Sequence, residues 1–235
     1  PKRLMRHFHL IHVPSYTNEI NKTIFSSILS QRLREFSDEI KNEIKNVTEA
    51  TISIFDECKK NLLPIPSKLH YVFSFRNLVR VIRGILMTKP NLTSTKDDFL
   101  KLWYHEMLRE FEDRLSMQED RKWFNEILNK YSKQFINFEI NNQMIIFNQF
   151  SDDSHEYKEV KKTMDELLKS CTILLEECNN NSSKPISITL FQEAISHLSA
   201  ISRTFSMRRG HSMLVGVKSS GRKSLARLGL FISEM

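Results

Sequence analysis

The chain has 235 residues and a net charge of +7, with 40% hydrophobic and 27% charged residues. This composition excludes a disordered chain and indicates a globular one of one or two domains. No apolar run is long enough to cross a bilayer, and cations alternate with acids, as between Arg109 and Asp120, so neither a membrane nor a nucleic acid is expected as a partner.

The N-terminal quarter predicts one strand and two helices. Phe8 to Val13 alternates in hydrophobicity and ends at a proline, which is typical of a short buried strand. Apolar residues at helical spacing begin after Thr17 and continue more weakly to Ile44. A second helix is predicted around the apolar residues from Ile52 to Leu62, and prolines end it.

The next element contains an arginine in an unusual place. The alternating residues His70 to Phe75 give way to a helical stripe from Leu78 to Ile85, so Arg76 falls in the first turn of a helix. A cation there opposes the helix dipole. Two interpretations remain open: Arg76 lies at the surface, or it points at an anion.

The middle of the chain predicts two aromatic-rich helices after a polar linker. The first opens at Thr95, and the second starts from a capping-box pattern at Ser116 to Glu119. Their aromatic stripe indicates a packed core rather than a cofactor site. Helical periodicity then breaks from Asn137 to His155, where the apolar run Met144 to Phe147 is typical of an edge strand.

Two more helices lead to the stretch that carries the chemistry. One has its apolar stripe between Tyr157 and Cys178, and the next between Leu190 and Phe205. A short apolar run, Met213 to Val217, then enters a glycine-bounded turn, and an amphipathic segment from Leu225 leaves it. This is the strand, loop and helix order of a phosphate-binding loop.

The turn resembles a phosphate-binding loop in spacing but departs from it in residues. Arg222 stands where the loop lysine is expected and Lys223 where the hydroxyl is expected, while Ser224 comes one position late. Four of the five glycines fall between Gly210 and Gly229, where backbone N–H groups would have to approach a phosphate. A plain strand-to-helix turn is the alternative. The candidate nucleotide-binding residues are Gly216, Val217, Lys218, Ser219, Ser220, Gly221, Arg222, Lys223 and Ser224.

No metal-binding or catalytic residue is expected. The three cysteines, Cys58, Cys171 and Cys178, are scattered, and no Cys/His spacing resembles a metal site. Hydrolysis in a phosphate-loop module needs a carboxylate pair on a later strand, and the sequence shows no such strand after the loop. We therefore expect a piece of a longer polypeptide that does not hydrolyse ATP by itself.

Several motifs occur in the order found in dynein heavy chains, and the whole chain resembles that family. The resemblance implies the end of the third AAA+ module followed by the start of the fourth. The motifs are Arg6-His-Phe8, Ile24-Phe-Ser-Ser-Ile28, His70-Tyr-x-Phe-x-x-Arg76-x-Leu78, Gly84-Ile-Leu86, Leu102-Trp-x-His105-Glu106, Glu119-Asp-Arg-x-Trp-Phe124 and Leu214-Val-Gly-Val-x-x-Ser-Gly-Arg222.

The resemblance implies a mostly α fold with a few short strands, taken from two α/β phosphate-loop modules. Residues 1–90 would hold the last strand and the helical small domain of the third module, and residues 91–150 a helical continuation and linker. Residues 151–235 would be the N-terminal part of the fourth module, ending just after the phosphate loop.

The resemblance also assigns roles to single arginines. Arg76 matches the arginine that a small domain directs at its own module's nucleotide, and Arg3 or Arg6 lies near the position from which a module reaches its neighbour's nucleotide. The axonemal pattern keeps glycines where this chain has Lys218 and Ser219, and a glutamine at position 223. Lys218 either replaces the missing cation or fills the space of the phosphate.

The function implied is a part of an ATP-driven microtubule motor whose loop binds ATP or ADP, alone or with Mg²⁺, in a regulatory or structural role. Its partners would be the other AAA+ modules, intermediate and light chains, and microtubules. Its place would be the axoneme of a cilium or flagellum, with the cytoplasm as the alternative. The rival hypothesis is a non-enzymatic helical scaffold whose loop has lost its ligand; a nucleic-acid-binding domain rests on net charge alone.

Overall fold

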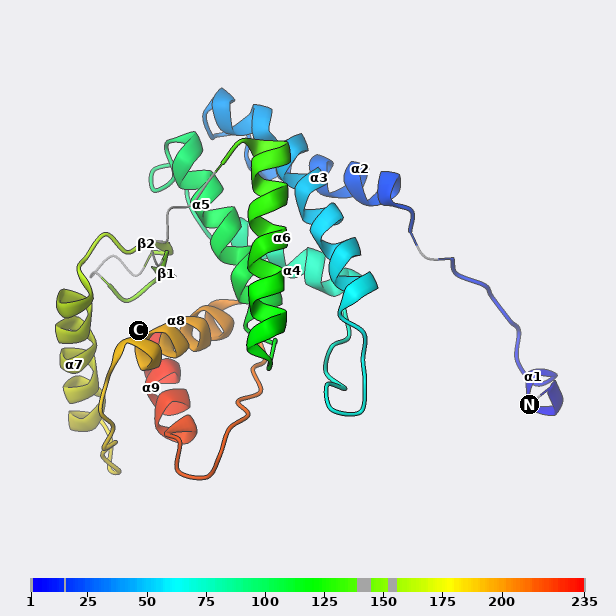
Figure 1. The fold of residues 1–235 in the computed structure, drawn as a ribbon. Helices are drawn as coiled ribbons and strands as arrows, with labels where there is room; N and C mark the ends of the chain where they lie inside the picture. Colours follow the sequence, from blue (N-terminus) through cyan, green and yellow to red (C-terminus); the bar gives the residue numbers. More distant parts are fainter. Residues whose placement is uncertain (1, 15, 139–144, 152–155, 235) are drawn as a thin grey trace.

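The computed structural model describes residues 2–14, 16–138, 145–151 and 156–234, and it is 60% helical with one two-stranded sheet (Figure 1). The expected mostly α fold is thereby confirmed. The elements in chain order are α1 (Lys2–Met5), α2 (Asn18–Arg32), α3 (Asp38–Asn61), α4 (Phe75–Ile85), α5 (Lys96–Met107), the π-helical turn η1 (Leu108–Glu112), α6 (Gln118–Ile136), β1 (Phe147–Asn148), β2 (Lys158–Glu159), α7 (Met164–Asn180), α8 (Gln192–Ser206) and α9 (Arg222–Glu234).

Helices α2 to α6 enclose the larger of two hydrophobic cores. As predicted, α2 begins after Thr17 and α5 after Thr95, and each threonine Oγ1 accepts a hydrogen bond from the first turn, at 3.4 and 3.2 Å. The aromatic stripe is core, as expected: Phe99, Trp103, Phe111 and Phe124 are all buried. Inside this core the Trp103 indole N–H donates to Thr51 Oγ1 at 2.8 Å.

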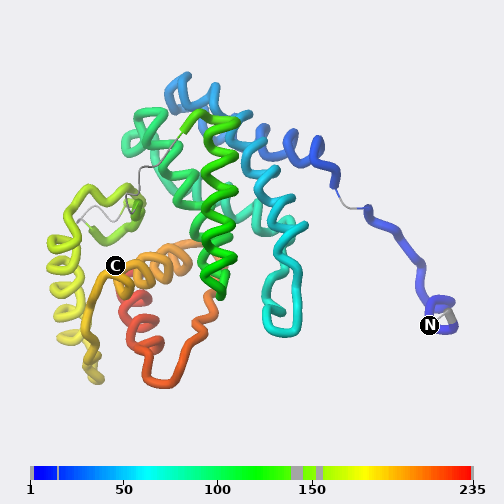
Figure 2. The backbone as a smooth tube through the Cα atoms, viewed as in Figure 1, coloured from blue at the N-terminus to red at the C-terminus, as the bar shows by residue number. Residues whose placement is uncertain are grey.

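Helices α7, α8 and α9 enclose the second core. Helix α9 crosses α8 at Gly229, where an added Cβ would lie 2.6 Å from Ile201 Cγ2. The glycine therefore lets the two helices approach more closely than any other residue would. Figure 2 shows α7, α8 and α9 beside the group formed by α2 to α6.

The short sheet lies between the two cores. β1 pairs antiparallel with β2, with Phe147 opposite Glu159. Successive side chains of a strand point to opposite sides. Ile146 accordingly belongs to the second core and Phe147 to the first, so this segment joins them.

Helix boundaries differ from the prediction in two parts of the chain. The helix predicted from Tyr157 begins only at Met164, because Lys158–Glu159 pair with β1 as strand β2. The other difference lies between α2 and α3. The first helix ends at Arg32, and α3 runs without interruption from Asp38 through the region predicted as a separate helix. The break falls at Ser37, whose extended backbone precedes two acidic residues in the first turn of α3. The apolar stripe continues across the break, so periodicity alone could not locate it.

The predicted capping box at Ser116 is wrong, although the helix that follows is present. α6 begins one residue later, after Met117. The Ser116 backbone N–H donates to Tyr71 Oη at 3.0 Å, and Tyr71 in turn donates to Asp120 Oδ2 at 2.8 Å. A contact from a distant segment thus holds this helix start, where a local cap was expected.

Two predicted strands are not formed. Phe8 to Val13 and Met213 to Val217 are irregular and exposed, and among the described residues neither pairs with another strand. A strand needs a neighbour for its backbone hydrogen bonds. Segment 6–14 extends away from the helices in Figures 1 and 2, so no neighbour lies beside it.

The other two strand-like patterns have mixed outcomes. His70 to Phe75 is not a strand before α4, yet its alternation is real, because Tyr71 and Phe73 are buried while Val72 is exposed. Of the predicted edge strand Met144 to Phe147, Met144 lies outside the described residues. The strand that forms is Phe147–Asn148.

The bond between Trp103 and Thr51 gives a test of the first core. Replacing Thr51→Val should lower the free energy of unfolding by about 1–3 kcal/mol more than Thr48→Val, because only the first change leaves a buried indole N–H without an acceptor. Thr48 is the matched control, since both buried threonines donate to the carbonyl four residues earlier, at 2.7 Å. Urea unfolding followed by circular dichroism measures both; equal losses would contradict the assignment.

Candidate functional site

The candidate phosphate loop forms a tight turn at the start of α9. Ser219 and Gly221 have left-handed backbones, with φ of +66° and +74°. The first bond that continues into the helix runs from the Leu225 N–H to the Gly221 carbonyl, at 2.9 Å. The N–H groups of Arg222, Lys223 and Ser224 precede that bond, and they find no acceptor among the described residues. The turn therefore presents three backbone donors in a row.

The charge around this turn is wholly positive. Arg222 and Lys223 stand in the first turn of α9, which contains no acidic residue, and Lys218 lies exposed in the loop. Each of α2, α3, α5, α6, α7 and α8 has an acid in its first turn, which complements the helix dipole. Among the helices longer than one turn, α4 and α9 lack one, and both carry arginine there. An anion at these two positions would balance the dipole and the cations together.

The loop residues that depart from the phosphate-loop pattern still form a turn. A serine at φ +66° adopts a conformation that glycine favours, which costs roughly 1 kcal/mol. A Cβ at Gly216 would lie 3.1 Å from Ser220 Oγ and 3.4 Å from Arg222 Cδ, so these two side chains pack closely over this glycine. The apolar run ahead of the loop is open to solvent, with Met213, Val215 and Val217 about four-fifths exposed (83%, 82% and 79%).

The structure brings the loop residues together but leaves the other candidate arginines apart. Arg76 is an exposed residue of α4, a helix that packs in the first core. The loop instead precedes α9, which packs in the second core. Arg3 lies in α1, and Arg6, just after it, donates from Nε to His7 Nε2 at 3.2 Å. Both lie at the end of the extended N-terminal segment (Figure 1).

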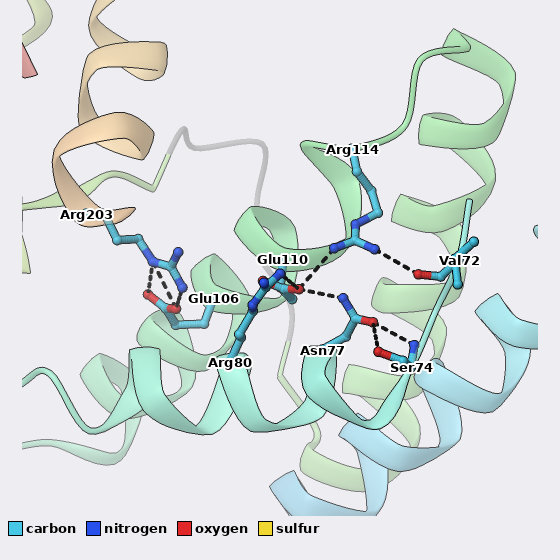
Figure 3. Close-up of polar contacts among 8 residues, drawn as sticks. All are labelled: Val72, Ser74, Asn77, Arg80, Glu106, Glu110, Arg114 and Arg203. Atoms are coloured by element: carbon cyan, nitrogen blue, oxygen red, sulfur yellow. Dashed lines mark hydrogen bonds and ion pairs between the residues drawn. The ribbon is translucent and has the colours of Figure 1, made fainter. Parts of the chain in front are cut away.

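A buried polar network fixes the helix turn that carries Arg76 (Figure 3). The Ser74 N–H donates to Asn77 Oδ1 at 2.7 Å, and Asn77 Nδ2 donates to Glu110 Oε1 at 2.6 Å. The same carboxylate oxygen accepts from Arg114 at 3.2 Å and from Arg80 at 3.4 Å. Because Asn77 follows Arg76 directly, the network sets the position of the Arg76 backbone.

Glu110 is the centre of this network. Burial raises the pKa of its carboxyl, while the hydrogen bond from Asn77 and the charges of Arg114 and Arg80 lower it. Arg114 also donates to the Val72 carbonyl at 3.2 Å, so it ties the segment before α4 to the same point. The first turn of α4 is thereby held from two sides.

A second buried network joins the two cores. Arg203 of α8 donates through Nε to both carboxylate oxygens of Glu106 on α5, at 3.0 and 3.1 Å, and its Nη2 forms a further bond to the same group (Figure 3). Tyr157 Oη donates to Glu106 Oε1 at 2.6 Å. Although burial lowers the pKa of Arg203, the charge and hydrogen bonds of Glu106 raise it above its ordinary value. Both partners are buried.

Gly84 makes room for this ion pair. A Cβ there would lie 1.5 Å from Glu106 Oε2 and 2.9 Å from an Arg203 terminal nitrogen. The motifs that contain Gly84 and Glu106 were visible in the sequence, but nothing pointed to Arg203, 97 residues beyond Glu106. Sequence reasoning therefore missed the junction.

In the described part of the chain, no helix combines the length and apolarity that a membrane span requires. The same residues contain no group of three histidine, cysteine, aspartate or glutamate side chains that could hold a metal ion.

Comparison with known proteins assigns both halves of this arrangement to one family. Residues 22–121 match the family model for the dynein heavy chain ATPase lid domain, and residues 186–235 match the one for the P-loop containing dynein motor region D4. The chain belongs to the dynein heavy chain family. Glu106 falls in the lid match and Arg203 in the D4 match, so the buried ion pair joins two regions of the dynein motor.

Relatives from animals and algae agree with this dynein assignment. Human dynein axonemal heavy chain 6 is 32% identical over 98% of this chain and 6% of its own length, and human dynein axonemal heavy chain 1 is 32% identical over 99% and 6%. The dynein-1-beta heavy chain of the flagellar inner arm I1 complex of Chlamydomonas reinhardtii is 32% identical over 100% and 5%. This dynein chain thus spans about one-twentieth of the length of these relatives.

The steric role of Gly84 gives a test of the junction. Gly84→Ala should lower the free energy of unfolding by about 3 kcal/mol or more, because its methyl group displaces a carboxylate from a buried ion pair. In a chain that already carries Glu106→Ala and Arg203→Ala, the same change should cost far less, since the clash is gone. Chemical denaturation of the three variants and the unchanged protein measures this coupling; additive effects would show that Gly84 acts elsewhere.

Proposed function

We propose that this dynein segment forms the junction between the third and fourth AAA+ modules of a heavy chain motor, and that its loop 216–224 binds the phosphates of ATP or ADP. The observation that carries the proposal is the start of α9, where a glycine-bounded turn, three free backbone donors and three cations meet without an acid. The likeness to the P-loop region D4 supports the same residues.

The proposed role of this nucleotide is regulatory or structural rather than hydrolytic. Lys223 occupies the position where a phosphate loop usually offers a hydroxyl to Mg²⁺, and Ser224 follows it. Arg222 in place of lysine presents a planar fork, which suits a bound phosphate but changes its geometry. We therefore assign no catalytic residue to this chain, and Mg²⁺ accompanies the nucleotide only as its counter-ion.

For Arg76 we propose the role of sensor for the nucleotide of the third module. Arg76 is exposed, among the described residues its guanidinium has no partner, and the Asn77–Glu110 network holds its helix turn. A fixed, unpaired arginine at a helix N-terminus is suited to a phosphate. Arg3 or Arg6 remains the proposed contact to a neighbouring module's nucleotide.

The proposed setting is a microtubule motor of the axoneme. The relatives described above carry axonemal or flagellar names, and the lid and D4 matches belong to the motor part of such chains. The proposed partners are the other AAA+ modules, intermediate and light chains, and microtubules. The module limits near residues 90 and 150 are part of the same proposal.

Titration calorimetry with ATP and ADP, with and without Mg²⁺, tests the loop in a protein that spans the complete fourth module. The double variant Arg222→Ala, Lys223→Ala should weaken binding at least about 100-fold, because two charge-assisted contacts of about 1.5–3 kcal/mol each are lost. Lys169→Ala, an exposed cation on α7, is the control and should bind as the unchanged protein does. A folded protein that binds neither nucleotide would favour the scaffold hypothesis.

Arg76 requires a separate measurement, in a protein that spans the complete third module. Arg76→Ala should weaken ATP binding to that module by about tenfold, the value of one charge-assisted contact. Arg83→Ala removes an exposed cation from the same helix and serves as the matched control. If Arg76→Ala and Arg83→Ala bind ATP with equal affinity, Arg76 is a surface residue and not a sensor.

A further inference from the structure

A cavity of about 220 Å³ lies between the two regions of the chain. One wall is formed by the end of α5 and by η1, with His105 and Arg109. The opposite wall is α8, with Ser199, and Ile145 and Ile146 close the cavity from the segment before β1. The residues that line it thus come from both cores.

Three of the residues that line the cavity carry a buried polar atom without a partner: His105 Nε2, Arg109 Nε and Ser199 Oγ find no hydrogen bond among the described residues. Only 3% of His105 and 4% of Ser199 is exposed, so bulk solvent does not satisfy them. An unpaired buried polar atom costs about 1–3 kcal/mol in general, and native structures rarely keep several side by side. Their grouping around one cavity indicates an occupant.

The donor and acceptor pattern defines that occupant. His105 Nδ1 lies 3.1 Å from the Ile145 carbonyl, which only accepts, so Nδ1 carries the proton and Nε2 offers a lone pair. Arg109 Nε offers a hydrogen, and the Ser199 hydroxyl either donates or accepts. Burial, Arg109 and Arg203 lower the pKa of His105, which therefore stays neutral at pH 7.

The occupant must also be uncharged. The Arg109 guanidinium already pairs with Asp113 at 3.3 Å, and Glu112, at the edge of the cavity, accepts from Asn125 at 2.9 Å. The charges facing the cavity thus have partners within the protein. What remains unsatisfied is one acceptor, one donor and one hydroxyl.

We propose that the cavity binds a cluster of ordered water molecules that bridges His105 and Arg109 of the lid region to Ser199 of the D4 region. Water donates and accepts at once, and the space far exceeds the roughly 10–15 Å³ that a single water needs. Ser199 and Arg203 lie one turn apart on α8, and His105 precedes Glu106 directly. The junction therefore has two adjacent parts, a direct ion pair and a hydrated contact.

Two serine variants decide between a hydrated and an empty cavity. If water binds Ser199, Ser199→Ala should raise the equilibrium constant of unfolding about fivefold relative to Ser30→Ala, because a buried bridging hydrogen bond is lost. Ser30 is the control: it is an exposed serine of helix α2, away from the cavity, so bulk water solvates its hydroxyl in either case. In an empty cavity, removing an unpartnered hydroxyl would leave the protein equally stable or more stable, and that result would overturn the proposal.

A crystal structure of the full chain that resolves ordered water gives an independent test. Density for water within hydrogen-bonding distance of both His105 Nε2 and Ser199 Oγ would support the proposal. A dry cavity would overturn it, as would a single larger molecule in place of the water cluster.

Discussion

The ion pair between Glu106 and Arg203 is the interaction on which the arrangement of the chain depends. Two buried charges are costly unless each meets the other, and here the carboxylate also accepts from Tyr157. A shift of α8 by one turn would leave both charges buried and unpaired. The lid and D4 regions therefore dock in a single register, and Gly84 supplies the space that this register requires.

The position of the candidate loop follows from this pair through α8. Arg203 lies near the end of that helix, and α9 packs closely against the same helix at Gly229. Since the loop leads directly into α9, its orientation relative to the lid is set by contacts far from any phosphate. The buried pair, rather than the loop sequence, connects the two candidate nucleotide positions.

The sequence predicted the helices well where local physics decides them. Thr17 and Thr95 cap their helices, and the start of α9 after Gly221 follows from the turn pattern. Three of the misses share one cause: they depend on partners far away in the chain. Tyr71 replaces the expected cap at Ser116, the apolar run Met213 to Val217 lacks a neighbouring strand, and Arg203 meets Glu106 across 97 residues. Hydrophobic periodicity shows which face of a segment is apolar, but it does not show which other segment packs against that face.

Helices α4 and α9 both lack an acidic residue in the first turn, and both carry an arginine there. An arginine at a helix N-terminus is unfavourable unless an anion compensates the dipole. The first turn of α4, which carries Arg76, is held by a hydrogen bond between the buried side chains of Asn77 and Glu110. The loop before α9 contains Ser219, whose backbone is left-handed. Such local costs persist where function requires the geometry. Both turns belong to bodies that the Glu106–Arg203 pair joins, so this pair sets the position of one proposed phosphate contact relative to the other.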